Sequence, residues 1–470
     1  MMNWIVLSPE MWMLATAGLF LVRAMMRPDA GRNHVLALVT AAIAAGVALG
    51  GAGFNGDLFA GTYRVDLFSQ FYKCLLAVGF FLVVSLCSDT KGIREELEAE
   101  FYLLLAVATL AMMMLVSSVH LLTIYITLEL SSYSLYILVS LNRDRDRGIR
   151  AGLKYFLVGA SASAVMLFGL ALVYGTSGTA YLIDIMAALP ALTGQAAFNL
   201  GLFLVLGGFF FKLAVFPFHV WAPDVYEGAA HPVAAYIATA SKVAAVGILV
   251  RVAALGQAAY FVHVLAAMAI VSMTLGNLAA VAQQDFKRLL AYSSIAHGGY
   301  ILIGILSMNT VGYAAATFYA LSILIMKFTC FMVVVKVAVG NKNPSLSDLT
   351  GLHRRAPLMA MALMMALFGL AGIPPTIGFT GKLLLFTAAM SQGHFTLVLI
   401  AMINVVISLY YYLKVLRAAY LLEPADDAPP LRETLPLKAL SIAMIAAMVI
   451  LGLYPHHLIE LTRRAAALLS

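Results

Sequence analysis

Apolar runs of about twenty residues recur along the whole chain, and they constrain its fold more than any other feature. A helix needs about twenty such residues to cross a hydrocarbon core of roughly 30 Å. The composition agrees, since 63% of the 470 residues are hydrophobic and only 11% are charged. Ordinary soluble proteins carry roughly a quarter charged residues. The sequence therefore predicts an all-α polytopic membrane protein.

The apolar runs predict fourteen membrane spans with no long soluble domain between them. The first run has neither a basic region before it nor a small-residue cleavage site, so we expect it to be a retained span. The predicted spans are residues 4–24, 34–54, 66–88, 101–117, 119–140, 151–175, 198–221, 232–255, 259–283, 289–308, 311–338, 356–391, 395–422 and 437–456.

Basic residues concentrate in alternate loops, which predicts the orientation of the spans. The loops that follow spans 1, 3, 5, 9 and 11 are basic, whereas the other loops hold little beyond Arg64 and Arg251. We therefore expect these odd-numbered loops to be cytoplasmic and both termini to be periplasmic. Because the net charge of +7 is spread over short loops and forms no basic stripe, it does not indicate a nucleic-acid partner. The loop residues are Arg23, Arg27, Arg32, Lys91, Arg94, Arg143, Arg145, Arg147, Arg150, Lys287, Arg288, Lys342, Arg354 and Arg355.

Two spans are interrupted by proline in similar contexts. The first interruption is LAVFP at 213–217 in span 7, and the second is LAGIPPTIGFTGK at 370–382 in span 12. A proline removes a backbone hydrogen bond, and within a membrane such a break survives only where it is buried in protein or lines a cavity. Paired interruptions in corresponding halves indicate an ion pathway. The alternative is that both prolines are packing kinks.

The interruptions divide most of the chain into two halves of five spans each. Because five is an odd number, the second half is expected to run inverted relative to the first. The predicted organisation is an N-terminal three-helix segment (1–100), a first repeat (101–255), a second repeat (256–422), and a C-terminal helix with its tail (423–470).

Four ionisable residues lie within apolar spans: Glu129, Lys212, Lys242 and Lys382. A charge at the bilayer centre costs about 3 kcal/mol on insertion scales, so such residues face the bundle interior and are functional candidates. No arginine lies near the middle of a span. Since lysine can release its proton in a desolvated site and arginine cannot, the pattern favours a proton relay. The alternative is a set of structural ion pairs.

Other polar residues extend the candidate relay. His297, in LLAYSSIAHGGY, is a possible proton shuttle because imidazole titrates near neutrality. Lys327 is either a relay member or the partner of an acid. Further relay candidates are Ser241, Ser293 and Ser294, and lysines expected to reach the membrane interface from span ends are Lys73, Lys154, Lys336 and Lys414.

The sequence offers no cofactor or metal motif. The three cysteines are scattered in apolar spans without iron–sulfur spacing. The segment 51–56 matches G-x-G-x-x-G but lies at the end of a membrane helix, so we expect a turn there. His219, Asp224, Glu227 and His231 lie at the mouth of the first interruption, but without the compact spacing of metal ligands.

Several long stretches resemble the antiporter-like membrane subunits of respiratory complex I, with subunit N of bacterial NADH:quinone oxidoreductases as the nearest branch. They are LLTIYITLELSSYSLYIL, FKLAVFPFHVWAPDVYEG, ASKVAAVGILVR, QQDFKRLLAYSSIAHGGY and LAGIPPTIGFTGKLLLF. The resemblance implies fourteen helices, two inverted five-helix repeats, discontinuous helices 7 and 12, and a proton channel through Glu129, Lys212, Lys242 and Lys382. Lys327 departs from the family, in which asparagine is commoner at that position.

The resemblance also implies partners. They would be subunit M, small membrane subunits and the lipid bilayer of the bacterial inner membrane. This chain would bind no cofactor, because NADH, FMN, iron–sulfur clusters and quinone are expected on other subunits. Two alternatives stay open: a subunit of a multisubunit sodium/proton antiporter, and a structural membrane anchor whose buried charges only pair.

Overall fold

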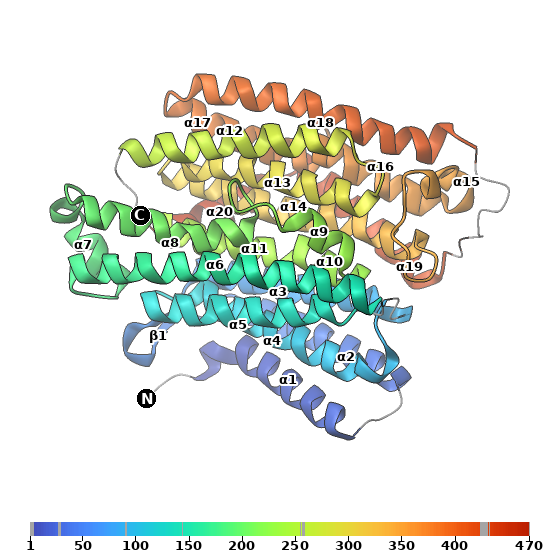
Figure 1. Cartoon of the computed structure of the whole chain (residues 1–470), viewed down its shortest axis with the longest axis horizontal. Helices are drawn as coiled ribbons and strands as arrows, with labels where there is room; N and C mark the ends of the chain where they lie inside the picture. Colours follow the sequence, from blue (N-terminus) through green and yellow to red (C-terminus); the bar gives the residue numbers. More distant parts are fainter. Residues whose placement is uncertain are drawn as a thin grey trace.

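The computed structural model is a bundle of α-helices that run side by side along the long axis of the molecule (Figure 1). It describes residues 4–26, 30–89, 92–142, 144–253, 255, 259–423, 431 and 433–469. Arg27, Lys91 and Arg143, three of the basic loop residues used to predict orientation, lie outside the described residues. Figure 1 marks both ends of the chain on the left, near β1 and α7, whereas α9 and α15 lie towards the right.

The helices are α1 (Ser8–Met26), α2 (Ala30–Gly50), α3 (Leu67–Ser85), α4 (Glu98–Ser117), α5 (Leu121–Ser140), α6 (Arg145–Ser177), α7 (Leu182–Leu192), α8 (Ala196–Leu213), α9 (Ala222–Gly228), α10 (His231–Ala238), α11 (Ala240–Ala253), α12 (Ala259–Val281), α13 (Phe286–Ile305), α14 (Thr310–Val337), α15 (Leu352–Arg355), α16 (Pro357–Ala371), α17 (Ile377–Ser391), α18 (Phe395–Leu421), α19 (Leu435–Leu453) and α20 (His456–Ala467). Short 3₁₀ turns are η1 (Trp4–Leu7), η2 (Phe59–Gly61), η3 (Cys87–Asp89), η4 (Glu95–Leu97) and η5 (Ser347–Leu349).

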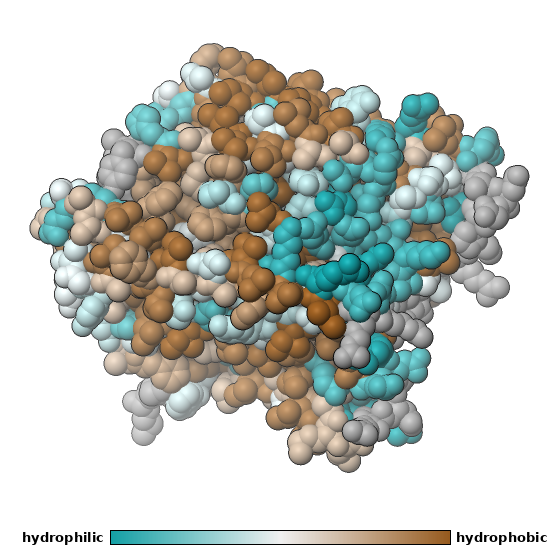
Figure 2. Space-filling view, in the orientation of Figure 1, coloured by the Kyte–Doolittle hydropathy of each residue, from teal (hydrophilic) through white to brown (hydrophobic). Residues whose placement is uncertain are grey.

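The structure confirms a polytopic helical protein. Among the described residues, 12 helical stretches are long and apolar enough to cross a membrane. The other two of the fourteen predicted spans correspond to α13, which is not among these 12, and to the interrupted pair of shorter apolar helices α16 and α17. Brown apolar surface covers much of the face drawn in Figure 2, and teal polar surface gathers over the region where Figure 1 places α9. The division into 1–100, 101–255, 256–422 and 423–470 stays a prediction.

Backbone breaks divide or shorten the helices of three predicted spans. α8 ends at Leu213, eight residues before the end of the predicted span 198–221. The predicted span 232–255 is two helices, α10 and α11, separated at Thr239, whose φ of −116° and ψ of −87° are not helical. Span 356–391 is interrupted between α16 and α17, as its prolines predicted.

The end of the bundle near α1 carries a small hairpin. Strands β1 (Gly56–Leu58) and β2 (Tyr63–Val65) pair antiparallel, with Gly56 opposite Val65. The preceding glycine-rich segment is a turn, in which the Phe54 amide donates to the Gly51 carbonyl at 3.0 Å. The predicted turn is therefore confirmed.

Close packing of the helices depends on small residues, as is usual in membranes. A Cβ atom added to Gly169 of α6 would lie 2.6 Å from the carbonyl oxygen of Gly201 on α8. Glycine at this crossing lets the two backbones meet. The contact fixes α8, which carries Lys212, against α6.

The prediction that Lys73 reaches the membrane interface is wrong. Lys73 is fully buried, and its Nζ lies 2.6 Å from Oε1 of Glu10 on α1. The Tyr63 hydroxyl donates to the same carboxylate oxygen at 2.5 Å. Nearby, Arg251 of α11 pairs with Asp66 at 2.9 Å. These two ion pairs join α1, β2, α3 and α11, so the charge that was predicted to be interfacial is a structural contact.

We predict that Lys73→Ala destabilises the protein by about 3–5 kcal/mol, because it leaves the Glu10 carboxylate buried without its cation. Thermal unfolding of the purified protein in detergent measures the effect. The double change Glu10→Gln with Lys73→Met should recover part of the loss. Lys414→Ala is the matched control, since Lys414 is only half-buried and forms no ion pair among the described residues. Equal losses for Lys73→Ala and Lys414→Ala would contradict the assignment.

Candidate functional site

The first break leaves a helix end inside the bundle. α8 stops at Leu213, and Ala214 adopts a left-handed conformation with φ 59° and ψ 45°. The Phe216–Pro217 peptide that follows is cis, and helix resumes only at α9. A helix C-terminus exposes carbonyl groups without intrahelical donors and carries partial negative charge. This end can therefore accept hydrogen bonds from a buried cation.

Lys242 uses that acceptor. Its Nζ donates to the backbone carbonyl of Lys212 at 3.0 Å and lies 5.1 Å from the ring centroid of Trp221. Both lysines are almost fully buried, with 2% exposure for Lys212 and 4% for Lys242. The break after α8 and the first turn of α11 thus bring these two lysines together.

Lys212 contacts α5 through hydroxyl groups. Its Nζ donates to Ser131 Oγ at 2.5 Å and to Ser132 Oγ at 3.4 Å. Glu129, also on α5, accepts from Ser163 Oγ of α6 at 2.5 Å. Among the ion pairs of the described residues, none joins Glu129 directly to Lys212. The Glu129 carboxylate belongs to α5, and the Lys212 ammonium of α8 is held against the two serines that follow Glu129 along that helix.

The second break repeats the arrangement of the first. α16 ends at Ala371, and Gly372 is left-handed with φ 85°. Lys382 Nζ donates to the carbonyls of Leu370 at 2.7 Å and Ala371 at 3.1 Å. A Cβ atom on Gly372 would lie 3.0 Å from Lys382 Cδ, so glycine serves both the turn and the lysine. The ring of Tyr300 lies 4.8 Å from the ammonium.

A hydrogen-bonded chain of side chains lies between the two breaks. Lys327 Nζ donates to the Leu290 carbonyl at 2.8 Å and to Ser293 Oγ at 2.7 Å. Ser293 Oγ contacts the Tyr412 hydroxyl at 2.5 Å, and Tyr412 lies 3.2 Å from His297 Nε2. The other imidazole nitrogen lies 2.7 Å from the Tyr319 hydroxyl. Among the described residues, Lys327 therefore binds carbonyl and hydroxyl groups, whereas one of its two predicted roles was to pair with an acid.

The two ends of this chain approach the lysines at the breaks. α11, which carries Lys242, packs against α14, which carries Lys327. At the other end, the His297 ring lies 5.8 Å from the Tyr300 ring, which in turn contacts Lys382. All six predicted residues are buried, and they are called the buried line below: Glu129, Lys212, Lys242, Lys327, His297 and Lys382.

Sequence reasoning missed most of the hydroxyl groups on this line. The serine and tyrosine residues concerned are Ser131, Ser132, Ser163, Tyr319 and Tyr412. Ser131 and Ser132 were detectable, because they follow Glu129 within one helical turn. Tyr319 and Tyr412 come from distant helices and gave no signal in sequence. Of the predicted serines, Ser293 joins the chain, whereas Ser294 donates to the backbone of its own helix.

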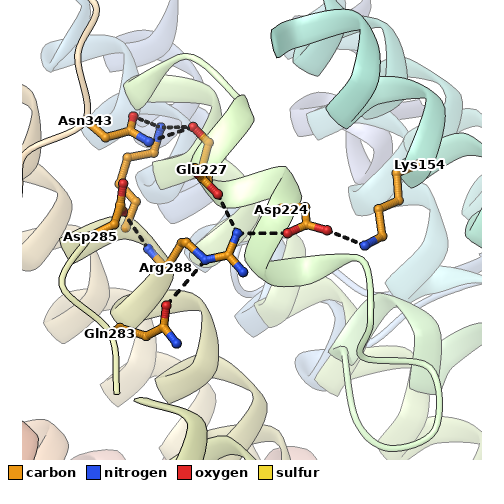
Figure 3. A network of polar contacts seen from close by, with 8 residues as sticks. Lys154, Asp224, Glu227, Gln283, Asp285, Arg288 and Asn343 are labelled. Carbon is orange, nitrogen blue, oxygen red and sulfur yellow. Dashed lines mark hydrogen bonds and ion pairs between the residues drawn. The ribbon is translucent and has the colours of Figure 1, made fainter. Parts of the chain in front are cut away.

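A second polar network lies at the mouth of the first break (Figure 3). Arg288 binds Asp224, at 2.9 Å, and Glu227; Asp224 also binds Lys154. Burial alone would raise the pKa of Asp224, but the hydrogen bonds from Lys154 and Arg288 outweigh it and lower that pKa below its ordinary value. Asp224 and Glu227 thus hold α9 to α6 and α13.

Lys287 supports the same network from below the surface. It is fully buried, although the sequence placed it in a cytoplasmic loop. Its Nζ donates to the backbone carbonyls of Glu227, at 3.2 Å, and Ala229, at 2.7 Å, and to Asn343 Oδ1 at 3.2 Å. Three acceptors replace the water that this ammonium loses, and they fix the end of α9.

The sequence and the fold of this chain are similar to those of known proteins. Residues 118–408, which contain the whole buried line except its neighbour Tyr412, match the family model "NADH:quinone oxidoreductase/Mrp antiporter, TM". The chain belongs to this family. It is 59% identical over 468 residues to the "NADH-quinone oxidoreductase subunit N 2" of Syntrophobacter fumaroxidans, covering 99% of both chains.

Solved structures of the NADH:quinone oxidoreductase/Mrp antiporter family share the fold. A chain of respiratory complex I from Thermus thermophilus is 34% identical, with a TM-score of 0.84 over 96% of this chain and 98% of that one. A chain of the Mrp complex from a Dietzia species has a TM-score of 0.88 over 100% and 98% of the two chains. At 22% identity, the second likeness shows the fold alone.

We predict that Asp224 supports stability above its ordinary pKa, near 3.8, and loses this effect as the pH falls through its lower folded pKa. The sign follows because a carboxyl group with a depressed folded pKa favours folding only when it is ionised. Thermal unfolding of wild type and Asp224→Asn should differ by a constant amount between pH 5 and 8 and converge below about pH 4, given the ordinary pKa of aspartate. A difference that grows towards pH 4 would contradict the prediction.

Proposed function

We propose that this chain is a subunit N-type membrane subunit of NADH:quinone oxidoreductase that moves protons through the buried line from Glu129 to Lys382. Electron transfer to quinone takes place on other subunits. The close relatives over the full chain support the assignment to the oxidoreductase. The proton-transfer role of the individual residues rests on their geometry.

One observation carries the role: each half of the chain has a broken helix whose terminal carbonyls hold a buried lysine. Lys242 binds the end of α8, and Lys382 binds the end of α16. Carbonyl groups stabilise an ammonium group but carry no formal charge. A direct carboxylate partner, by contrast, would neutralise the lysine in a permanent ion pair. A lysine in such a site can therefore gain and lose a proton while the helix ends stay in place.

The groups between the lysines are suited to proton transfer. A hydroxyl both donates and accepts a hydrogen bond, and imidazole does so through two different nitrogens. Ser293, Tyr412 and His297 form such a sequence, with Lys327 at one end. A proton that enters at Lys327 can leave through His297 towards Lys382, with water completing the longer steps.

The charge of Glu129 supplies a control on the first lysine. In the proposal, the carboxylate favours the protonated form of Lys212 while Ser131 and Ser132 hold the ammonium beside α5. Neutralising or displacing Glu129 would release the proton from Lys212 towards Lys242, whose ammonium already contacts the Lys212 carbonyl. The state in which Lys212 and Lys242 are both protonated is unfavourable, since like charges repel in a low dielectric.

The proposal extends to partners and location. NADH, FMN, iron–sulfur clusters and quinone would be bound by partner subunits, and this chain would contact subunit M and small membrane subunits in the bacterial inner membrane. The basic odd-numbered loops support a cytoplasmic position for α9 and its network. The even number of predicted spans supports placing both termini on the periplasmic side.

We expect both Lys212→Ala and Lys212→Arg to abolish most NADH-driven acidification of inverted membrane vesicles. Alanine removes the proton-binding group, and arginine keeps the charge but cannot release its proton. NADH oxidation is followed in the same vesicles, and assembly of the complex is checked on native gels. Pumping restored by Lys212→Arg would show that only the positive charge matters and would overturn the relay.

Tyr412→Phe should lower the number of protons pumped per NADH oxidised, because it removes the hydroxyl that joins Ser293 to His297. Tyr410→Phe is the matched control: it changes the same residue type two positions away on α18, where the side chain is 63% exposed. The ratio of proton uptake to NADH oxidation is the readout. Identical ratios for both variants would remove Tyr412 from the pathway.

A further inference from the structure

The hydroxyl group of Tyr226, on α9, is buried and lies outside the pathway described so far. The side chain is fully inaccessible to solvent, and its oxygen has no hydrogen-bond partner among the described residues. Burying a polar group without a hydrogen bond is unfavourable, so native proteins rarely keep one unless it has a further role. Tyr226 is therefore a candidate for a role other than stability.

The neighbours of Tyr226 hold it in place without using its hydroxyl. α9 packs against α13, and the Tyr226 ring lies 6.0 Å from the ring of Phe331 on α14. Lys287 of α13 donates to the backbone carbonyls of Glu227 and Ala229 and so fixes the end of α9. Phenylalanine at position 226 would keep all of these contacts.

The outer side of α9 is open to water. Asp224 and Glu227, which flank Tyr226 in the sequence, have 38% and 36% of their side chains exposed. They belong to the polar network of Figure 3, and polar surface gathers over this region in Figure 2. One turn of α9 thus leads from water-exposed carboxylates to a buried hydroxyl. In the proposed orientation this is the cytoplasmic side.

The inner side of Tyr226 faces the buried line through Ser294. The Ser294 side chain lies near enough to interact with the Tyr226 hydroxyl, although not in hydrogen-bonding geometry. Ser294 Oγ donates to the Leu290 carbonyl at 2.9 Å, and Lys327 Nζ donates to the same carbonyl at 2.8 Å. Two groups bound to one oxygen lie no farther apart than a single bridging water reaches. Ser294 therefore lies between Tyr226 and Lys327.

We propose that the Tyr226 hydroxyl carries protons from water at the mouth of the first break to Ser294 and Lys327. The proposal rests on the proposed function, to which it adds an entry from the cytoplasmic side. Tyr226 accepts a proton from water and gives its own to Ser294, and Ser294 turns its hydrogen from the Leu290 carbonyl to the Lys327 amine. Each hydroxyl gains one proton as it loses another, so only Lys327 gains the charge that the water loses.

Tyr226→Phe tests the proposal, because it removes only the hydroxyl. The assembled complex should keep its melting temperature or raise it, since no hydrogen bond is lost. Proton uptake per NADH oxidised, measured in inverted membrane vesicles, should fall several-fold towards the level of Lys212→Arg.

Tyr236→Phe is the matched control. Tyr236 is also fully buried, on α10, but its hydroxyl lies 2.6 Å from Thr109 Oγ1 on α4. Its loss should lower the melting temperature of the complex and leave the ratio of proton uptake to NADH oxidation unchanged. The two tyrosine variants are therefore expected to have opposite effects.

The outcomes separate this proposal from the proposed function. A wild-type ratio in Tyr226→Phe, with pumping abolished in Lys212→Arg, would overturn the entry through Tyr226 and leave the relay standing. Wild-type ratios in both variants would overturn both. Failure of Tyr226→Phe to assemble, a melting temperature lowered as in Tyr236→Phe, or equal losses of pumping in the two tyrosine variants would show that the hydroxyl is structural and would overturn the entry.

Discussion

The structure depends on one mutual requirement between broken helices and buried lysines. In a membrane, a carbonyl group without a donor costs several kcal/mol, and so does an ammonium without acceptors. At the ends of α8 and α16, the helix-terminal carbonyls and the buried ammonium groups satisfy one another, because Lys242 and Lys382 donate hydrogen bonds to those carbonyls. Removing either the break or the lysine would leave its partner unsatisfied. The position of the charges in the bundle is therefore tied to the backbone itself.

Most of the fold was accessible from sequence, because in lipid a span must be apolar and helical over a fixed length. The prolines at 217, 374 and 375 likewise predicted both discontinuous helices. The break at Thr239 was not accessible, since no proline or glycine marks it. Lys73 was misplaced because sequence cannot show that Glu10, sixty-three residues earlier, comes to lie 2.6 Å from its ammonium.

The candidate site divides in the same way. Its ionisable residues are conspicuous within apolar spans. Glu129, Lys212, Lys242 and Lys382 could therefore be selected from their positions in the sequence alone. Hydroxyl groups do not stand out, because serine and tyrosine are common in membrane helices for packing reasons. Only the tertiary structure shows that Tyr412, of the three adjacent tyrosines in α18, meets both Ser293 and His297.

That shared hydroxyl has a consequence for timing. The Tyr412 hydroxyl carries one hydrogen and lies between Ser293 and His297. It can therefore donate a hydrogen bond to only one of them at a time. After one proton has passed, every hydrogen in the chain points the opposite way. The hydroxyls must then rotate back before a second proton can follow. In the proposed pathway, protons would therefore pass Tyr412 one at a time, with a rotation of the hydroxyl groups between passages.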